Sequence, residues 1–509
     1  MAIPRAGRLL IGGLAGMLAL CGGGAAVGGT LLWNAGVLDT AGKVAFATPL
    51  AIPPLAPSRL DGRGRRVFDL TAAPGTHDIG GRAVATWGYN GGYLGPTLRA
   101  ARGERVLVNV TNRLGEPTTV HWHGMRLPAL MDGGPHQPIP PGGTLQPTWR
   151  VDQPAATLWY HPHPHGATAP QVYRGLAGLF LLDEPDGPGE PGGPGGAALP
   201  GRYGVDDVPV LVTDVNVDGD RLDEDKAAFS DLGILGRQVL ANGVAGAYHD
   251  VRTEAVRLRL VNASPARSYG FGLADGRPFD LVGTDGGLLA APDRRTRLRL
   301  TPGERAEIVV RLRPGERVVL RSFPPGLHSV PALFDRAHGG HDTLDVLELR
   351  AAAALAPSPP LPAALAALPA PDPAGAATRT FRLSGHKING RKMDPGRLDA
   401  EITRGSTEVW AVRNADGVPH SFHVHDVRFR VLDPGDPALA GWKDTVYVPP
   451  NRELRLLIRF DGASDPAHPY MFHCHKLAHE DGGMMGQFAV VEPGQRALPP
   501  PPLPAAHDH

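Results

Sequence analysis

The chain has 509 residues, and its 51 basic and 51 acidic side chains give a formal net charge of zero. This length corresponds to about three domains of roughly 150 residues each, enough to form buried cores without disulfide bonds. The balanced charge and the lack of a long basic stripe in the sequence argue against nucleic acid as a partner. The 67 glycines and 53 prolines favour many turns and short strands over long helices.

An uncharged segment rich in Leu, Ala and Gly follows Arg5 and Arg8 and extends to Leu38. This pattern is typical of either a secretion signal or an N-terminal membrane anchor, and we assign residues 1–47 to it. Small residues on both sides of Phe46 offer a cleavage site. Both alternatives predict export to the periplasm, the cell envelope or the medium, with membrane contact only through this segment.

Two stretches rich in Pro with Gly or Ala, residues 184–196 and 351–377, divide the rest of the chain into blocks. The blocks are 55–185, 200–350 and 376–495. Each contains a short run rich in β-branched residues that leads to an Asn and a turn: Arg105–Thr111, Val256–Val261 and Glu408–Arg413. Such runs are typical of β-sandwiches, and their recurrence predicts an all-β chain with three related sandwiches.

Four clusters of histidine stand out, and each contains the pattern His-x-His. They are His121-Trp-His123, His161-Pro-His163, His420-Ser-Phe-His423-Val-His425 and His473-Cys-His475. On a strand, residues i and i+2 share a face, so each pair presents two imidazoles together. Two pairs come from the first block and two from the third, and eight converging imidazoles predict a site for several metal ions.

Cys474 is one of only two cysteines, and the other lies in the N-terminal segment. If its run is a strand, Cys474 faces away from His473 and His475. His420 lies an odd number of residues from His423 and His425, so it faces the Cys474 side. With His479 and Met484 beyond the strand, a thiolate, imidazoles and a thioether form the ligand set of an electron-transfer copper site.

These clusters, together with Asp132-Gly-Gly-Pro, Gly441-Trp-Lys-Asp-Thr and His479-Glu-Asp-Gly-Gly-Met-Met-Gly-Gln-Phe, resemble the multicopper oxidases. The resemblance covers nearly all of the chain after residue 55 and is strongest to three-domain bacterial members, the cuprous-oxidase and laccase-like group. It implies three tandem cupredoxin-like Greek-key β-sandwich domains and four copper ions. The implied ligands are His420, Cys474, His479 and Met484 for type 1; His121 and His423 for type 2; and His123, His161, His163, His425, His473 and His475 for the type 3 pair.

The resemblance also implies an activity. A small donor such as a phenol, an aromatic amine or a metal ion would lose electrons one at a time, and dioxygen would be reduced to water. Cuprous-oxidising relatives carry a Met-rich insert, whereas residues 351–377 contain no Met. We therefore favour a laccase-like oxidase acting as a monomer, and leave cuprous ion open as a substrate.

Several further residues receive roles from the resemblance. Asp132 and Glu480 are expected to lie near the three-copper cluster and to help deliver protons. Asp444 is placed on the rim of the type 1 site. His165 and Met485 are expected to be outside the ligand set, and the stretch from His328 to His341 to be a surface loop.

Other classes of protein stay open. Structural zinc usually needs several thiolates, and one Cys beside so many imidazoles does not fit it. A copper nitrite reductase lacks the full set of type 3 pairs. A non-catalytic copper-binding or structural cell-envelope protein of the same fold typically loses ligands, and this chain keeps them all.

Overall fold

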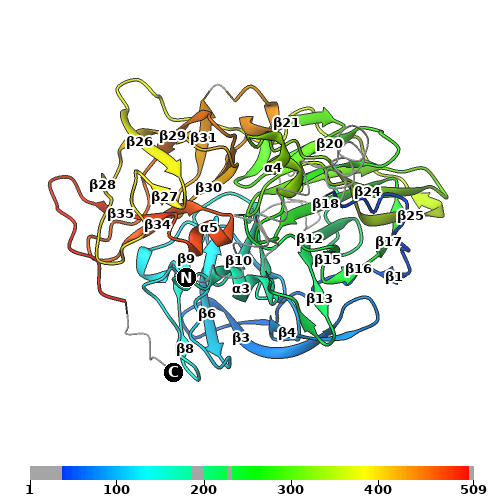
Figure 1. Ribbon diagram of the computed structural model, residues 1–509, viewed down its shortest axis with the longest axis horizontal. Helices are drawn as coiled ribbons and strands as arrows, with labels where there is room; N and C mark the ends of the chain where they lie inside the picture. The colour runs from blue at the N-terminus through cyan, green and yellow to red at the C-terminus, as the bar shows by residue number, and fades with distance from the viewer. Residues whose placement is uncertain (1–36, 186–198, 226–231, 433, 504–509) are drawn as a thin grey trace, which may run out of the picture.

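The computed structural model describes residues 37–185, 199–225, 232–432 and 434–503. These residues form six β-sheets that pack in three pairs, and each pair encloses a hydrophobic core of its own. The pairs follow one another along the chain, from the blue and cyan first block through the green middle block to the yellow and red third block (Figure 1). The predicted all-β class is confirmed.

The first pair of sheets encloses a core that includes Phe68, Trp122 and Phe180. Its larger sheet has the order β13-β14-β4-β3-β6-β8, with β2 and β9 attached, and the smaller has the order β5-β11-β10-β7. The strands are β2 (Ser58–Leu60), β3 (Arg65–Asp78), β4 (Ala83–Tyr89), β5 (Leu98–Ala101), β6 (Arg105–Asn112), β7 (His121–His123), β8 (Thr144–Leu145), β9 (Thr148–Arg150), β10 (Ala156–His161), β11 (Gly178–Asp183), β13 (Val217–Asp218) and β14 (Arg221–Leu222).

The middle pair encloses the largest of the three cores, around Leu258, Phe271 and Ile308. Its sheets have the orders β16-β15-β12-β18-β23-β20-β21 and β1-β17-β25-β24-β19-β22. The strands are β1 (Thr48–Pro49), β12 (Asp207–Val215), β15 (Gln238–Ala241), β16 (Val244–Ala245), β17 (Ala247–Thr253), β18 (Ala255–Asn262), β19 (Tyr269–Leu273), β20 (Phe279–Thr284), β21 (Gly287–Arg295), β22 (Leu298–Leu300), β23 (Arg305–Arg311), β24 (Arg317–Phe323) and β25 (Leu344–Ala356).

The third pair encloses an aromatic core around Phe381, Trp410 and Phe472, and Cys474 and Met484 belong to the same core. Its sheets have the orders β27-β26-β29-β33-β31 and β28-β35-β34-β30-β32. The strands are β26 (Ala377–Ser384), β27 (Lys387–Ile388), β28 (Ala400–Thr403), β29 (Thr407–Asn414), β30 (His420–Val424), β31 (Phe429–Leu432), β32 (Thr445–Val448), β33 (Glu453–Arg459), β34 (Tyr470–Cys474) and β35 (Met485–Val491).

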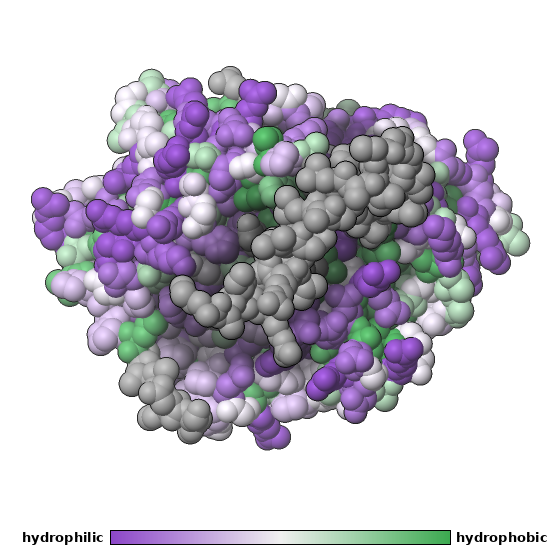
Figure 2. Space-filling model, in the orientation of Figure 1, coloured by the Kyte–Doolittle hydropathy of each residue, from purple (hydrophilic) through white to green (hydrophobic). Residues whose placement is uncertain are grey.

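The helices of the described residues are short and connect strands. They are α3 (Thr168–Tyr173), α4 (Ala332–Ala337), α5 (Leu477–Asp481) and the 3-10 turns η1 (Ala129–Met131) and η2 (Pro437–Ala440). No helix within the described ranges is both long and apolar enough to cross a bilayer. The view in Figure 2 shows a mostly hydrophilic described surface on which apolar side chains form small, separate patches.

The three predicted strand runs lie within β6, β18 and β29, and each of these strands pairs in parallel with an earlier strand of its block, β3, β12 or β26. The Asn that ends each strand is buried and makes the same contacts. The side-chain amides of Asn112, Asn262 and Asn414 each donate to two backbone carbonyls, and their oxygens accept from the amide two residues on. The recurring Asn thus fixes the loop that follows each strand.

Two short pieces depart from the predicted division into blocks. β13 and β14 continue the sheet of the first pair, although their residues fall in the predicted middle block. Residues 37–49 contact the middle pair: the Leu38 amide donates to Asp342 at 2.8 Å, the Gly42 amide donates to Asp345 at 2.7 Å, and β1 pairs with β17. Residues 1–36 of the predicted signal or anchor lie outside the described residues.

Candidate metal centre

The four histidine pairs come from two pairs of neighbouring strands. In the first block, β7 runs antiparallel to β10 and places His121 opposite His161. In the third block, β30 runs antiparallel to β34 and places His423 opposite His473. Register therefore gathers two pairs on one side of the block interface and two on the other, and all eight imidazoles are buried.

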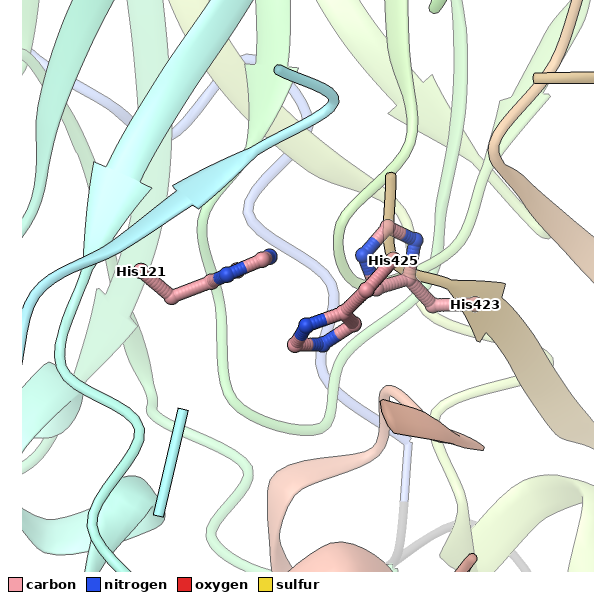
Figure 3. Close-up of side chains that lie close together, drawn as sticks. All are labelled: His121, His423 and His425. Carbon is pink, nitrogen blue, oxygen red and sulfur yellow. The ribbon is translucent and has the colours of Figure 1, made fainter. Parts of the chain in front are cut away.

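The two sets of imidazoles meet between the first and third blocks. Figure 3 shows His121 reaching from its strand in the first block toward His423 and His425 of the third. The rings of His121 and His425 stack with centroids 3.8 Å apart, and those of His123 and His423 do the same at 3.8 Å. Ligand atoms lie within 4.8 Å of one another in three all-histidine groups: His121, His423 and His425; His123, His161 and His475; His163, His425 and His473.

Spacing of the ring nitrogens fits metal coordination. The Nε2 atom of His473 lies 3.2 Å from that of His163 and 3.2 Å from that of His425, and His123 Nδ1 lies 3.4 Å from His161 Nε2. Two nitrogens bound to one tetrahedral ion at about 2.0 Å each lie roughly 3.3 Å apart. The nitrogens are thus spaced as ligands of shared ions.

In several of these rings, one nitrogen donates a hydrogen bond to an oxygen, and the other nitrogen is available to bind a metal ion. The Nδ1–H groups of His121, His161 and His423 donate to the backbone carbonyls of Asp132, Pro162 and Asp444. The Nε2 atoms of His121 and His423 have no hydrogen-bond partner, although they are buried. A buried nitrogen without a partner is costly, and a metal ion would satisfy it.

Protonation of the rings agrees with this arrangement. Burial, reinforced by the neighbouring imidazoles, lowers the pKa values of His123, His161, His423, His425 and His475 well below their usual value. Burial also lowers the pKa of His163 to about 4. Rings that stay neutral keep a lone pair for a metal ion, and neutral imidazole is the form that binds metals.

A second group lies on the opposite face of β34. Cys474 Sγ is 3.5 Å from His420 Nδ1 and 3.5 Å from His479 Nδ1, and these two nitrogens are 3.1 Å apart. Met484 is fully buried in the same core, and its carbonyl accepts the Cys474 amide at 3.1 Å. A triangle of two imidazoles and one thiol beside a methionine has the composition of a blue-copper site.

Electrostatics in this second group favour a cation. Burial alone would lower the pKa of His420, but Cys474 and Asp416 outweigh it and raise that pKa to about 9. Asp416 is 3.2 Å from the outer nitrogen of His420. Burial and the neighbouring His420 lower the pKa of His479 well below its usual value, so the group stabilises one positive charge beside the sulfur, which a copper ion could supply in place of the proton.

The predicted carboxylates lie beside the all-histidine groups. Asp132 Oδ2 accepts His425 Nδ1–H at 2.6 Å, and Glu480 Oε2 lies 3.0 Å from His473 Nδ1. Both side chains are buried. Burial would raise the pKa of Glu480, but His163 and His473 hold it below its usual value, so the carboxylate stays ionised.

The placement of Asp444 at the rim of the Cys474 group is wrong. Its Oδ1 atom is 3.1 Å from His123 Nε2 and 3.7 Å from His423 Nδ1, so it borders the all-histidine groups. Asp444 lies directly before β32, and its side chain contacts His123 of the first block and Arg305 of the middle block. Arg305, which binds both carboxylate oxygens of Asp444, was not predicted, because no local sequence pattern marks it.

The remaining sequence candidates lie apart from these groups. His165 is exposed, and Met485 pairs with His473 across β34 and β35. The prediction of a surface loop from His328 to His341 holds only in part, because the stretch contains α4 and His338 is buried, with its Nδ1 3.3 Å from Ser329 Oγ. His341 is 44% exposed. Within the described part of the chain, none of these histidines belongs to a set of clustered metal-ligand atoms.

Comparison with known proteins gives consistent results. Residues 72–187 and 366–494 match family models described as multicopper oxidase. The chain is 38% identical over 460 residues to Cell division protein FtsP of Edwardsiella tarda, a match that covers 88% of this chain and 93% of that protein. It is 32% identical over 459 residues to Multicopper oxidase mco of Staphylococcus haemolyticus, which covers 87% of this chain and 92% of that one.

Solved structures show the same likeness. A laccase from Pediococcus acidilactici is 33% identical with a TM-score of 0.77, over 87% of this chain and 94% of the laccase. The laccase-like multi-copper oxidase CueO from Ochrobactrum sp. is 34% identical with a TM-score of 0.77, over 87% of this chain and 100% of that one. These matches confirm the cupredoxin-like fold, and the chain belongs to the multicopper oxidase family.

Proposed function

We propose that the protein is a laccase-like multicopper oxidase that oxidises small phenolic or aromatic-amine donors and reduces dioxygen to water. The observation that carries this proposal is the gathering of eleven His and Cys side chains into one Cys-containing group and three all-histidine groups. The proposed ligands are His420, Cys474, His479 and Met484 for type 1 copper; His121 and His423 for type 2; and His123, His161, His163, His425, His473 and His475 for the type 3 pair.

The chain itself would link the two sites. Bound copper supplies the one-electron chemistry that side chains cannot, taking electrons from the donor and passing them to dioxygen. Cys474 lies in the donor-facing group, and its sequence neighbours His473 and His475 lie in the all-histidine groups. The connection between the sites is therefore a few covalent bonds of one strand.

Buried carboxylates would orient the metal-binding imidazoles and accept or donate protons. Asp132 holds the Nδ1–H of His425 and leaves its Nε2 free, and Glu480 lies beside His473 and His163. Such partners fix the tautomer and direction of a metal-binding imidazole. The Oδ1 atom of Asp132 has no hydrogen-bond partner, and we propose it as a site that accepts a proton on the way to dioxygen.

The donor would approach His420. The outer nitrogen of His420 contacts Asp416, whose side chain is 22% exposed, and the next residue, Gly417, accepts the Val330 amide at 2.7 Å. Val330 is 56% exposed. A partly exposed carboxylate beside exposed apolar surface suits an aromatic donor with a hydroxyl or amino group. The chain has only 8 Met. Cuprous ion is therefore a less favoured substrate than an aromatic donor.

A non-catalytic role in the cell envelope is the second candidate. The likeness to Cell division protein FtsP, 38% identical, favours it. Retention of the complete ligand set favours the enzyme, because a structural role does not need buried histidines with free nitrogens.

Dioxygen uptake separates these two candidates. With phenols or aromatic diamines, the copper-loaded protein is expected to consume dioxygen, measured with an oxygen electrode across a donor panel that includes cuprous ion. The copper-free protein, prepared by chelation, serves as the control and should consume none. If the copper-loaded protein takes up no dioxygen with any donor, the oxidase proposal is wrong.

The thiol provides a second prediction. Cys474→Ser removes the sulfur ligand and keeps the volume of the side chain nearly unchanged, so the fold should remain. We expect the intense blue absorption of the copper-loaded protein to disappear and donor-driven dioxygen uptake to fall to the copper-free level. Blue colour that persists in the variant would contradict the type 1 assignment.

We propose export, with any cleavage site located before Leu38. The predicted site near Phe46 would remove residues that contact the middle block, including Leu38, Gly42 and the Phe46 carbonyl, which accepts from Arg350. N-terminal sequencing of the mature protein should therefore find a terminus before residue 38 or an intact anchor. A terminus at Thr48 would contradict this expectation.

A further inference from the structure

The side chain of Arg305 is fully buried where the three blocks meet. Its Nη1 and Nη2 atoms donate to Asp444 Oδ1 and Oδ2, each at 2.6 Å. Its Nε donates to the Thr157 carbonyl of the first block, and its remaining donors reach the carbonyls of Gly303 and Asp285 in its own block. All five guanidinium N–H groups are thus satisfied, and one side chain joins all three blocks.

Asp444, held in place by Arg305, in turn contacts His123. Its Oδ1 atom is 3.1 Å from His123 Nε2, and Thr445 Oγ1 lies 3.0 Å from the same nitrogen and 2.8 Å from Oδ1. With Nε2–H donated to Asp444, the lone pair of His123 is on Nδ1, the atom that faces His161. This is the reverse of His121 and His423, which donate through Nδ1.

Little free space remains around the ion pair of Arg305 and Asp444. Gly124 follows His123 with a φ of +84°, and a Cβ atom there would lie 2.5 Å from Arg305 Nη2 and 2.7 Å from Asp444 Oδ2. On the other side, a Cβ on Gly303 would lie 2.8 Å from the ring of His475. The turn before Arg305 therefore packs directly on an imidazole of the all-histidine groups.

A second ion pair holds the same segment. Lys443 Nζ lies 3.0 Å from Asp285 and 2.9 Å from Glu304, and all three side chains are buried. The Arg305 amide donates to Asp285 at 2.7 Å. Consecutive residues of the third block, Lys443 and Asp444, are thus both clamped by the middle block.

We propose that the middle block, whose described residues contribute no side chain to the clustered ligand groups, positions the copper cluster through Arg305. Arg305 and Asp444 act as positioning residues: the bidentate pair fixes the Asp444 carboxylate, and the carboxylate selects the His123 tautomer that presents Nδ1 to a type 3 copper. This inference rests on the proposed function. It assigns a role to the middle block beyond joining the other two.

Arg305→Lys tests the proposal because lysine keeps the charge and loses the planar fork that holds both oxygens of Asp444. We expect copper of the all-histidine groups to be lost about 10- to 100-fold more readily to a chelator, the size of effect typical when such a partner is removed. Weaker coordination of the type 3 pair should uncouple it, so a larger fraction of the bound copper should become EPR-visible. Blue absorption from the Cys474 site should be unchanged and serves as the internal reference.

Arg257→Lys is the matched control, because Arg257 is a buried bidentate partner of Asp207 in the same block. It should leave copper retention and the EPR signal as in the wild type. If Arg305→Lys behaves like this control, the proposal is wrong. If Arg305→Lys does not fold, Asp444→Asn decides, and wild-type copper retention and EPR in that variant would overturn the proposal. A wild-type protein that binds no copper would instead refute the proposed function.

Discussion

Alternation of side chains along β34 is the constraint on which the rest of the centre depends. His473 and Cys474 are adjacent in sequence, yet their side chains contact different sets of partners, His163 and His425 for the first and His420 and His479 for the second. The same alternation on β30 separates His420 from His423. β30 and β34 therefore contribute ligands to both sites, and the backbone of these neighbouring strands holds the two sites at a fixed separation.

Each buried imidazole has two ring nitrogens, and both need a partner inside the protein. Carbonyls and carboxylates take the N–H of each of several rings, such as Asp132 for His425 and Asp444 for His123. The opposite nitrogen is then left free and neutral. A cation between the rings would offset the cost of desolvating them, so metal binding explains the arrangement better than packing does.

Most of the centre was predictable because strand geometry is local. Parity along four short runs assigned His420 and Cys474 to one group and the paired histidines to others, and the recurring Asn at the ends of β6, β18 and β29 marked the three sandwiches. Arg305 was not predictable. It lies 139 residues from Asp444, and its importance comes from the meeting of three blocks, which no local pattern encodes. Asp444 was misplaced for the same reason, and β14 joined a sheet outside its own block.

The central claim is that one chain holds a mononuclear copper site and a separate cluster of three copper ions. Copper content measured together with quantitative EPR of the oxidised protein tests it most directly. The account predicts about four copper ions per chain, of which about half are EPR-silent because the type 3 pair is spin-coupled, with one blue and one non-blue signal making up the rest. A chain that binds a single blue copper, or copper that is entirely EPR-visible, would contradict the account.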